Sequence, residues 1–368
     1  MKPFTCPCSN ILFFENTQCL KCGSNVGYDA ASDSMKIIEP EGKLKQCANG
    51  TQHGVCNWLV PADSANPLCD ACQLNRTIPD LSVQGNGERW ARMEASKRRV
   101  AYSMHHLGLP IIPRTQDAET GLIFDFLQPM PGAPVITGHD FGIITLNMEE
   151  ADDAIRESNR QKFREPHRSL VGHFRHELAH YYWWVWFEKG TIDIELLNSF
   201  REVFGDERQD YGTALNNYYN GGPPSGWQGT HISEYSTAHP WEDWAETWAH
   251  YLHMTDALET ADTFGLSAGR QHVPVTRFPK ESVSLPAPFA NVDPGAFMDI
   301  LYHWAMLTPA INEMSLSLGQ RDLYPFVLTP PIVRKLHFIH CAMERVSGKM
   351  TEKKPVFNLW SVLRRKAA

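Results

Sequence analysis

Long apolar runs are missing from this chain of 368 residues. No stretch approaches the roughly 18 consecutive uncharged apolar residues of a membrane-spanning helix, so we expect no membrane contact. The first residues, MKPFTCPCSN, lack the apolar segment of a secretory signal, which predicts a cytoplasmic protein. Positive charge is also scarce, because 34 Lys and Arg stand against 42 Asp and Glu, for a net charge of −8. This acidic balance argues against nucleic acid as a partner.

Cysteine is nearly absent from most of the chain, since only Cys341 lies beyond residue 72. A disulfide scaffold is typical of small secreted proteins, whereas cysteines at short paired spacings in other long chains are more often metal ligands. The eight early cysteines form two sets of four, and four thiolates suit tetrahedral Zn²⁺. The first set is Cys6, Cys8, Cys19 and Cys22, and the second is Cys47, Cys56, Cys69 and Cys72.

The sequence leaves alternatives open for these two sets. The cysteines could form disulfides or be unrelated to one another, and iron in a rubredoxin-type site would use the same four thiolates. His53 could also replace a cysteine. Residues 1–75 are poor in apolar runs, so we expect metal rather than a hydrophobic core to hold them together. Zinc ribbons serve structure or partner docking, so a structural role and the docking of a protein partner both stay open for this head.

The rest of the chain divides into a linker and helix at 76–109, a larger body at 110–350 and a tail at 351–368. Hydrophobic spacing predicts a helix at 88–107 and strands at 121–127, 134–138 and 141–148. A long loop is predicted at 265–295. Further helical segments are expected at 168–189, 191–204, 206–220, 240–256, 295–318 and 330–347. The fold class is therefore α+β.

The segment HELAH places His176 and His180 four residues apart on a predicted helix. They lie about 40° apart around its axis, so both imidazoles can reach one Zn²⁺. Glu177 lies beside that face and is expected to act as the general base on a zinc-bound water. The metzincin continuation is missing, because WWVW occupies 183–186, so a third ligand must come from elsewhere. A buried helix with incidental histidines is the alternative, and His173 is a rival ligand.

The later helix HPWEDWAETWAHYLH, at 239–253, offers the third ligand. Glu242 and Glu246 share one face, so one carboxylate can bind zinc while the other orients a histidine ligand by a hydrogen bond. Asp243 lies about 100° away and is expected at the surface or as a cap. A solvated acidic face is the alternative reading of the pair. Burial is favoured by the tryptophans predicted to form the core, namely Trp183, Trp184, Trp186, Trp241, Trp244 and Trp248.

With HELAH followed by a downstream E-x-x-x-E helix, the chain resembles the gluzincin metallopeptidases, and lethal-factor-like enzymes are closest in layout. Nearly all of it also resembles the bacterial zinc-binding metallopeptidases with an N-terminal zinc-ribbon domain. In that family a double-cysteine head precedes HELAHYYW and HPWEDWAETWAHYLH. The resemblance implies a double zinc-ribbon head and a mainly helical gluzincin-like domain with a small sheet. It also implies that His176, His180 and Glu242 bind zinc and that Glu177 is the base.

The same resemblance singles out Tyr235, seven residues before Glu242. In lethal-factor-like enzymes a tyrosine occupies this offset, which implies that Tyr235 donates a hydrogen bond to the oxyanion. His231 and His239 are alternatives in the same loop. The strand at 141–148 is either a plain structural strand or a sheet edge that binds an extended substrate.

These features predict a zinc-dependent peptidase with a peptide or protein substrate and with one catalytic and two structural zinc ions. Two other functions stay open. One is a non-catalytic zinc-ribbon adaptor or regulatory protein, and the other is a zinc hydrolase of a non-peptide amide or ester. The presence of Glu177 favours an enzyme, because a structural zinc site needs no base beside it.

Overall fold

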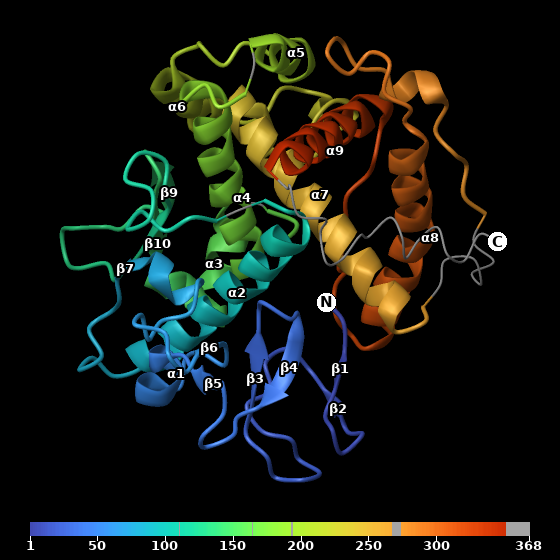
Figure 1. The fold of residues 1–368 in the computed structure, drawn as a ribbon. Helices are drawn as coiled ribbons and strands as arrows, with labels where there is room; N and C mark the ends of the chain where they lie inside the picture. Colours follow the sequence, from blue (N-terminus) through green and yellow to red (C-terminus); the bar gives the residue numbers. More distant parts are fainter. Residues whose placement is uncertain (110, 164, 193, 267–273, 351–368) are drawn as a thin grey trace. The chain divides into compact units, whose positions relative to one another are not determined.

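The computed structural model describes residues 1–109, 111–163, 165–192, 194–266 and 274–350, and these form an α+β fold, as predicted (Figure 1). They divide into two compact units. The first unit covers Met1–His105, 111–158 and the short segment Thr263–Gly265, and the second covers most of the chain from Asn159 onward. Among the described residues, no helix combines the length and the apolar composition that a membrane span requires. The predicted tail at 351–368 lies outside the described residues.

The head of the first unit is built from short antiparallel pairs of strands. β1 (Phe4–Thr5) pairs with β2 (Ile11–Leu12), β3 (Val26–Asp29) with β4 (Ser34–Ile37), and β5 (Leu44–Gln46) with β6 (Leu59–Pro61). The helix α1 (Ala48–His53) follows β5.

Aromatic side chains give this head a hydrophobic core, which Tyr102 of the later helix at Asn86–His106 joins. The ring of Phe14 lies edge-on to those of Tyr28 and Tyr102, with centroids 4.9 and 5.3 Å apart. Trp58 is also buried and its ring lies 5.1 Å from that of Tyr28. The expectation that metal replaces a core in residues 1–75 is therefore wrong. It underestimated how much apolar surface a few aromatic side chains bury.

The first unit also contains the long helix α2 (Asn86–His106), close to its predicted bounds, and a four-stranded sheet. The strand order is β7 (Asn75–Thr77), β8 (Ile123–Leu127), β10 (Ile143–Asn147) and β9 (Gly138–Asp140). β10 pairs in parallel with β8 and antiparallel with β9, so it is an inner strand. The hypothesis that residues 141–148 form a sheet edge for substrate is therefore wrong.

Two other predictions of this region need correction. Residues 76 and 77 were expected in a linker but belong to β7, where Arg76 and Thr77 both donate hydrogen bonds to Asp125. Asp125 is buried in the neighbouring strand β8, so these bonds fasten the end of the head to the sheet. The strand predicted at 134–138 begins only at Gly138.

Helices make up nearly all the regular structure that follows. They are α3 (Asp153–Lys162), α4 (Leu170–Trp183), α5 (Ile194–Phe204), α6 (Tyr211–Gly221), α7 (Pro240–Thr263), α8 (Gly295–Ser317) and α9 (Pro330–Met350). α4 continues from Trp184 to Glu188 as a π-helix. α7 runs past its predicted end near residue 256, because no Gly or Pro interrupts the chain before Gly265.

Tryptophans pack between α4 and α7 in the second unit, as predicted. Figure 1 shows the two helices beside each other. Trp186, Trp244 and Trp248 are fully buried. Trp244 donates from Nε1 to the carbonyl oxygen of Ala179 at 2.9 Å, and the ring of Tyr182 stacks on Trp248 with centroids 5.2 Å apart. This packing decides which face of α7 meets the histidines of α4.

Candidate metal and catalytic site

Three side chains from α4 and α7 converge in the second unit. The Nε2 atoms of His176 and His180 lie 3.1 Å apart. Glu242 Oε2 lies 3.0 Å from the first of these nitrogens and 3.5 Å from the second. Helix geometry explains the arrangement, because residues four apart lie on one face and α7 presents Glu242 to that face. These three residues form a group whose donor atoms could hold one metal ion.

The donor set fits Zn²⁺ in geometry. Tetrahedral Zn²⁺ with ligand bonds near 2.0–2.1 Å requires ligand atoms about 3.3 Å apart, close to the three separations observed here. Glu242 is buried, and its Oε2 accepts no well-aligned hydrogen bond from any described residue. An ionised carboxylate oxygen in such a position needs a cation.

Glu246 lies one turn beyond Glu242, where it contacts a histidine as expected. His176 donates from Nδ1 to Glu246 Oε1 at 2.8 Å, which leaves the lone pair of Nε2 toward His180 and Glu242. Ser233 donates from Oγ to Glu246 Oε2 at 2.7 Å. Glu246 is half-buried rather than fully buried, with 22% of its side chain exposed.

The electrostatics of the group favour positive charge. Burial alone would lower the pKa of His176, but the negative charges of Glu242 and Glu246 and the hydrogen bond to Glu246 raise it well above its ordinary value. Burial would raise the pKa of Glu242, yet the two histidines hold it well below its usual range. The carboxylates therefore stabilise a positive charge, whether it belongs to a proton or to a metal ion.

Glu177, the expected base, is buried next to this group. Burial raises the pKa of its carboxyl group, against the opposing effect of the two histidines. Its Oε2 has no hydrogen-bond partner among the described residues. An unsatisfied carboxylate oxygen in a buried position is suited to accept a proton from a small molecule.

Tyr235 lies near the histidines, with its ring centroid 6.0 Å from that of His176. Burial raises the pKa of its hydroxyl, so this group stays protonated and can donate. The two alternative donors are engaged elsewhere. His239 contacts the carbonyl oxygen of Gln209 through Nε2 and accepts from the backbone of Trp241 at Nδ1. His231 contacts Thr230 through Nδ1 at 2.9 Å.

Two residues of this site were missed in the sequence. Tyr211, at the start of α6, donates from its hydroxyl to Glu242 Oε1 at 2.7 Å. Ser233 is the hydroxyl donor to Glu246 described above. Each belongs to a segment outside the two helices that carry the motifs, so spacing within those helices gave no signal of them.

Asp243 was predicted at the surface or as a cap, and this prediction is wrong. Its side chain is 1% exposed and lies 2.5 Å from Lys335 Nζ of α9. Lys335 also donates to the carbonyl oxygen of Thr230 at 2.8 Å. The helical angle placed Asp243 away from the histidines correctly, but α9 covers that side of α7. Among the described residues, neither Asp243 nor His173 belongs to the His–Glu donor group.

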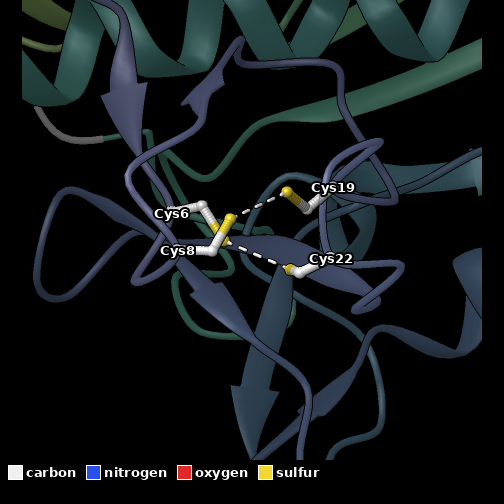
Figure 2. A group of neighbouring side chains, drawn as sticks. All are labelled: Cys6, Cys8, Cys19 and Cys22. Carbon is white, nitrogen blue, oxygen red and sulfur yellow. Dashed lines mark hydrogen bonds between the residues drawn. The ribbon is translucent and has the colours of Figure 1, made fainter.

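The first cysteine set also converges on one point, in the first unit (Figure 2). Cys6 Sγ lies 3.8 Å from Cys22 Sγ, and Cys8 Sγ lies 3.6 Å from Cys19 Sγ. A disulfide bond would bring two sulfurs to about 2.05 Å, so these thiols are free. Tetrahedral Zn²⁺ with Zn–S bonds near 2.3 Å requires sulfurs about 3.8 Å apart. The set fits zinc.

The second cysteine set, Cys47, Cys56, Cys69 and Cys72, is buried and also meets at one point. Cys56 and Cys69 hold their sulfurs 3.7 Å apart. Backbone N–H groups donate to two sulfurs, from Trp58 to Cys56 at 3.4 Å and from Cys69 to Cys47 at 3.3 Å. Such bonds stabilise thiolates, the form that binds metal. His53 is not part of this group and instead lies against the ring of Trp90.

Comparison with known proteins agrees with zinc binding both by the His–Glu group and by the cysteine sets. Residues 86–342 match the family described as "putative zinc-binding metallo-peptidase", and residues 3–83 match a zinc-ribbon domain. An uncharacterised protein of Mycobacterium tuberculosis is 41% identical over 349 residues, which cover 94% of this chain and 96% of that protein. An uncharacterised protein of Mycobacterium bovis matches equally well. No solved structure matches the chain significantly.

Proposed function

Because the chain belongs to the zinc-binding metallo-peptidase family, we propose that it hydrolyses peptide bonds at the group formed by His176, His180 and Glu242. The observation that carries the proposal is the convergence of these three donor atoms beside the buried carboxylate of Glu177. In this proposal the site is of the gluzincin type, with two histidines from one helix and a glutamate from a later helix. The substrate is a peptide or a protein.

In the proposed hydrolysis each residue of the site has a separate role. Zn²⁺ held by the three side chains would polarise the scissile carbonyl and lower the pKa of water to about 7. Glu177 takes the proton of the attacking water and delivers it to the leaving amine. Tyr235 donates a hydrogen bond to the negative charge that develops on the carbonyl oxygen. Glu246 keeps the Nε2 lone pair of His176 aimed at the common point of the donor group.

The same proposal assigns one zinc ion to each cysteine set, which gives three ions per chain. The sulfur separations of 3.6–3.8 Å support four thiolate ligands around one ion in each set. Iron would fit the same thiolates, and elemental analysis of the purified protein distinguishes the two metals.

The test is a digestion of a proteome-derived peptide library by the wild-type chain and by Glu177→Gln, with new termini identified by mass spectrometry. We expect new termini with the wild type and almost none with the variant. Zinc-loaded wild-type protein that yields no new termini would contradict the peptidase proposal. That result is expected if the protein is a non-catalytic adaptor, and also if it is an amidase specific for other compounds. Product masses from a panel of small amides would identify the amidase.

A further inference from the structure

The two carboxylate oxygens of Glu242 have different surroundings. This difference indicates that a residue other than the three ligands also acts on Glu242. Oε2 faces the two histidine nitrogens at 3.0 and 3.5 Å. Oε1 instead accepts a hydrogen bond from the hydroxyl of Tyr211 at 2.7 Å. The carboxylate of Glu242 is therefore fixed in one orientation, in which only Oε2 faces the two histidine nitrogens.

Tyr211 is held firmly in the position from which it donates. It is the first residue of α6, and the preceding Asp210 caps that helix by accepting a hydrogen bond from the backbone of Thr213 at 2.7 Å. Its ring lies edge-on to His239 at a centroid separation of 5.2 Å and against Trp241 at 5.5 Å. His239 directly precedes α7 and Trp241 lies in its first turn, so they fix the ring beside Glu242.

We infer that Tyr211 is a positioning residue that makes Glu242 a ligand through a single oxygen. The inference rests on the proposed zinc site. A hydrogen bond to Oε1 reduces the negative charge available on that oxygen and stops the carboxylate from rotating. The metal then keeps a coordination position that a second carboxylate oxygen would otherwise fill, and catalytic zinc requires such an open position. Tyr211 acts through Glu242, whereas Tyr235 is proposed to act on the substrate.

The experiment compares zinc affinity and hydrolysis in four variants of the full chain. Tyr211→Phe removes the hydroxyl and keeps the ring. Tyr235→Phe is the comparison, and Glu242→Ala identifies which of the bound ions belongs to the His–Glu group. Tyr302→Phe is the control, because this tyrosine lies on α8, where its ring contacts Arg277. Zinc affinity is measured by competition with a chromophoric chelator.

Tyr211→Phe is expected to weaken zinc binding at this group about 10–100-fold, and excess zinc should restore most of the hydrolysis. Tyr235→Phe should bind zinc normally and stay slow at any zinc concentration. Unchanged zinc affinity in Tyr211→Phe would overturn the inference, and so would a rate that excess zinc fails to restore. An inactive wild type would refute the proposed function without affecting the affinity comparison, whereas full zinc retention in Glu242→Ala would refute the ligand set itself.

Discussion

Glu177 is the residue on which hydrolysis depends in the proposed mechanism. Glu177→Gln should keep its zinc and lose about 10²–10⁴-fold in rate, because an amide cannot accept the proton of water. Initial rates on a cleaved peptide and zinc content measure the two properties separately. Glu188→Gln is a matched control, since Glu188 is exposed at the end of the π-helix that continues α4. Wild-type rates in Glu177→Gln would remove this residue as the base.

The two glutamates of α7 should respond differently to truncation. Glu242→Ala removes a carboxylate whose Oε2 faces both histidines, so we expect the His–Glu group to lose most of its zinc. Glu246→Ala removes the hydrogen-bond acceptor of His176 Nδ1 and of Ser233 Oγ but no oxygen of the donor group, so zinc should bind about 10–100-fold more weakly but still bind. Equilibrium dialysis against buffered zinc measures both. The opposite ranking of the two variants would exchange their assigned roles.

At the scale of single residues, the sequence predicted those contacts that follow from spacing along one helix. His176 and His180, or Glu242 and Glu246, share a face because four residues make slightly more than one turn. It could not predict Tyr211 or Ser233, whose contacts depend on how separate segments pack. Asp243 illustrates the same limit, since its direction on the helix was predictable but the covering Lys335 of α9 was not.

At the scale of elements, the buried ion pair between Asp243 of α7 and Lys335 of α9 should be sensitive to a single substitution. Lys335→Met leaves the carboxylate of Asp243 buried without its partner, and the loss of one member of such a pair typically costs about 3–5 kcal/mol. Urea unfolding followed by tryptophan fluorescence measures the change. The double variant Asp243→Asn and Lys335→Met should regain part of the loss. Equal stability of Lys335→Met and the wild type would show that Asp243 finds other compensation.

Elements were predictable where an apolar pattern was long and uninterrupted. α2, α4 and α7 follow from helical spacing, and the tryptophans of α4 and α7 made their burial predictable. Strand order was not predictable, because the pattern of a strand does not reveal its neighbours. The sequence of β10 is typical of a half-buried strand, but β9 pairs with the edge of β10 at which binding of an extended substrate was proposed.

For the whole molecule, the three donor groups predict three metal ions per chain. Protein purified without chelator should contain about three zinc atoms when each group holds one ion. Inductively coupled plasma mass spectrometry against a quantified protein concentration measures this ratio and detects iron at the same time. A value near one, with the eight early cysteines oxidised, would contradict the assignment of both cysteine sets.

The donor groups belong to different compact units, the cysteine sets to the first and the His–Glu group to the second. Loss of an ion from the first unit should therefore leave the His–Glu ion in place. Replacing Cys56 and Cys69 by serine removes two buried thiolates whose sulfurs lie 3.7 Å apart, so the protein should contain two ions instead of three. Its remaining zinc should still be sensitive to Glu242→Ala, and its peptidase rate per retained His–Glu zinc should match the wild type. Loss of the His–Glu ion in the cysteine variant, seen as remaining zinc that no longer responds to Glu242→Ala, would mean that the second unit needs the metal-loaded head to fold, and the two units would then fold as one cooperative structure.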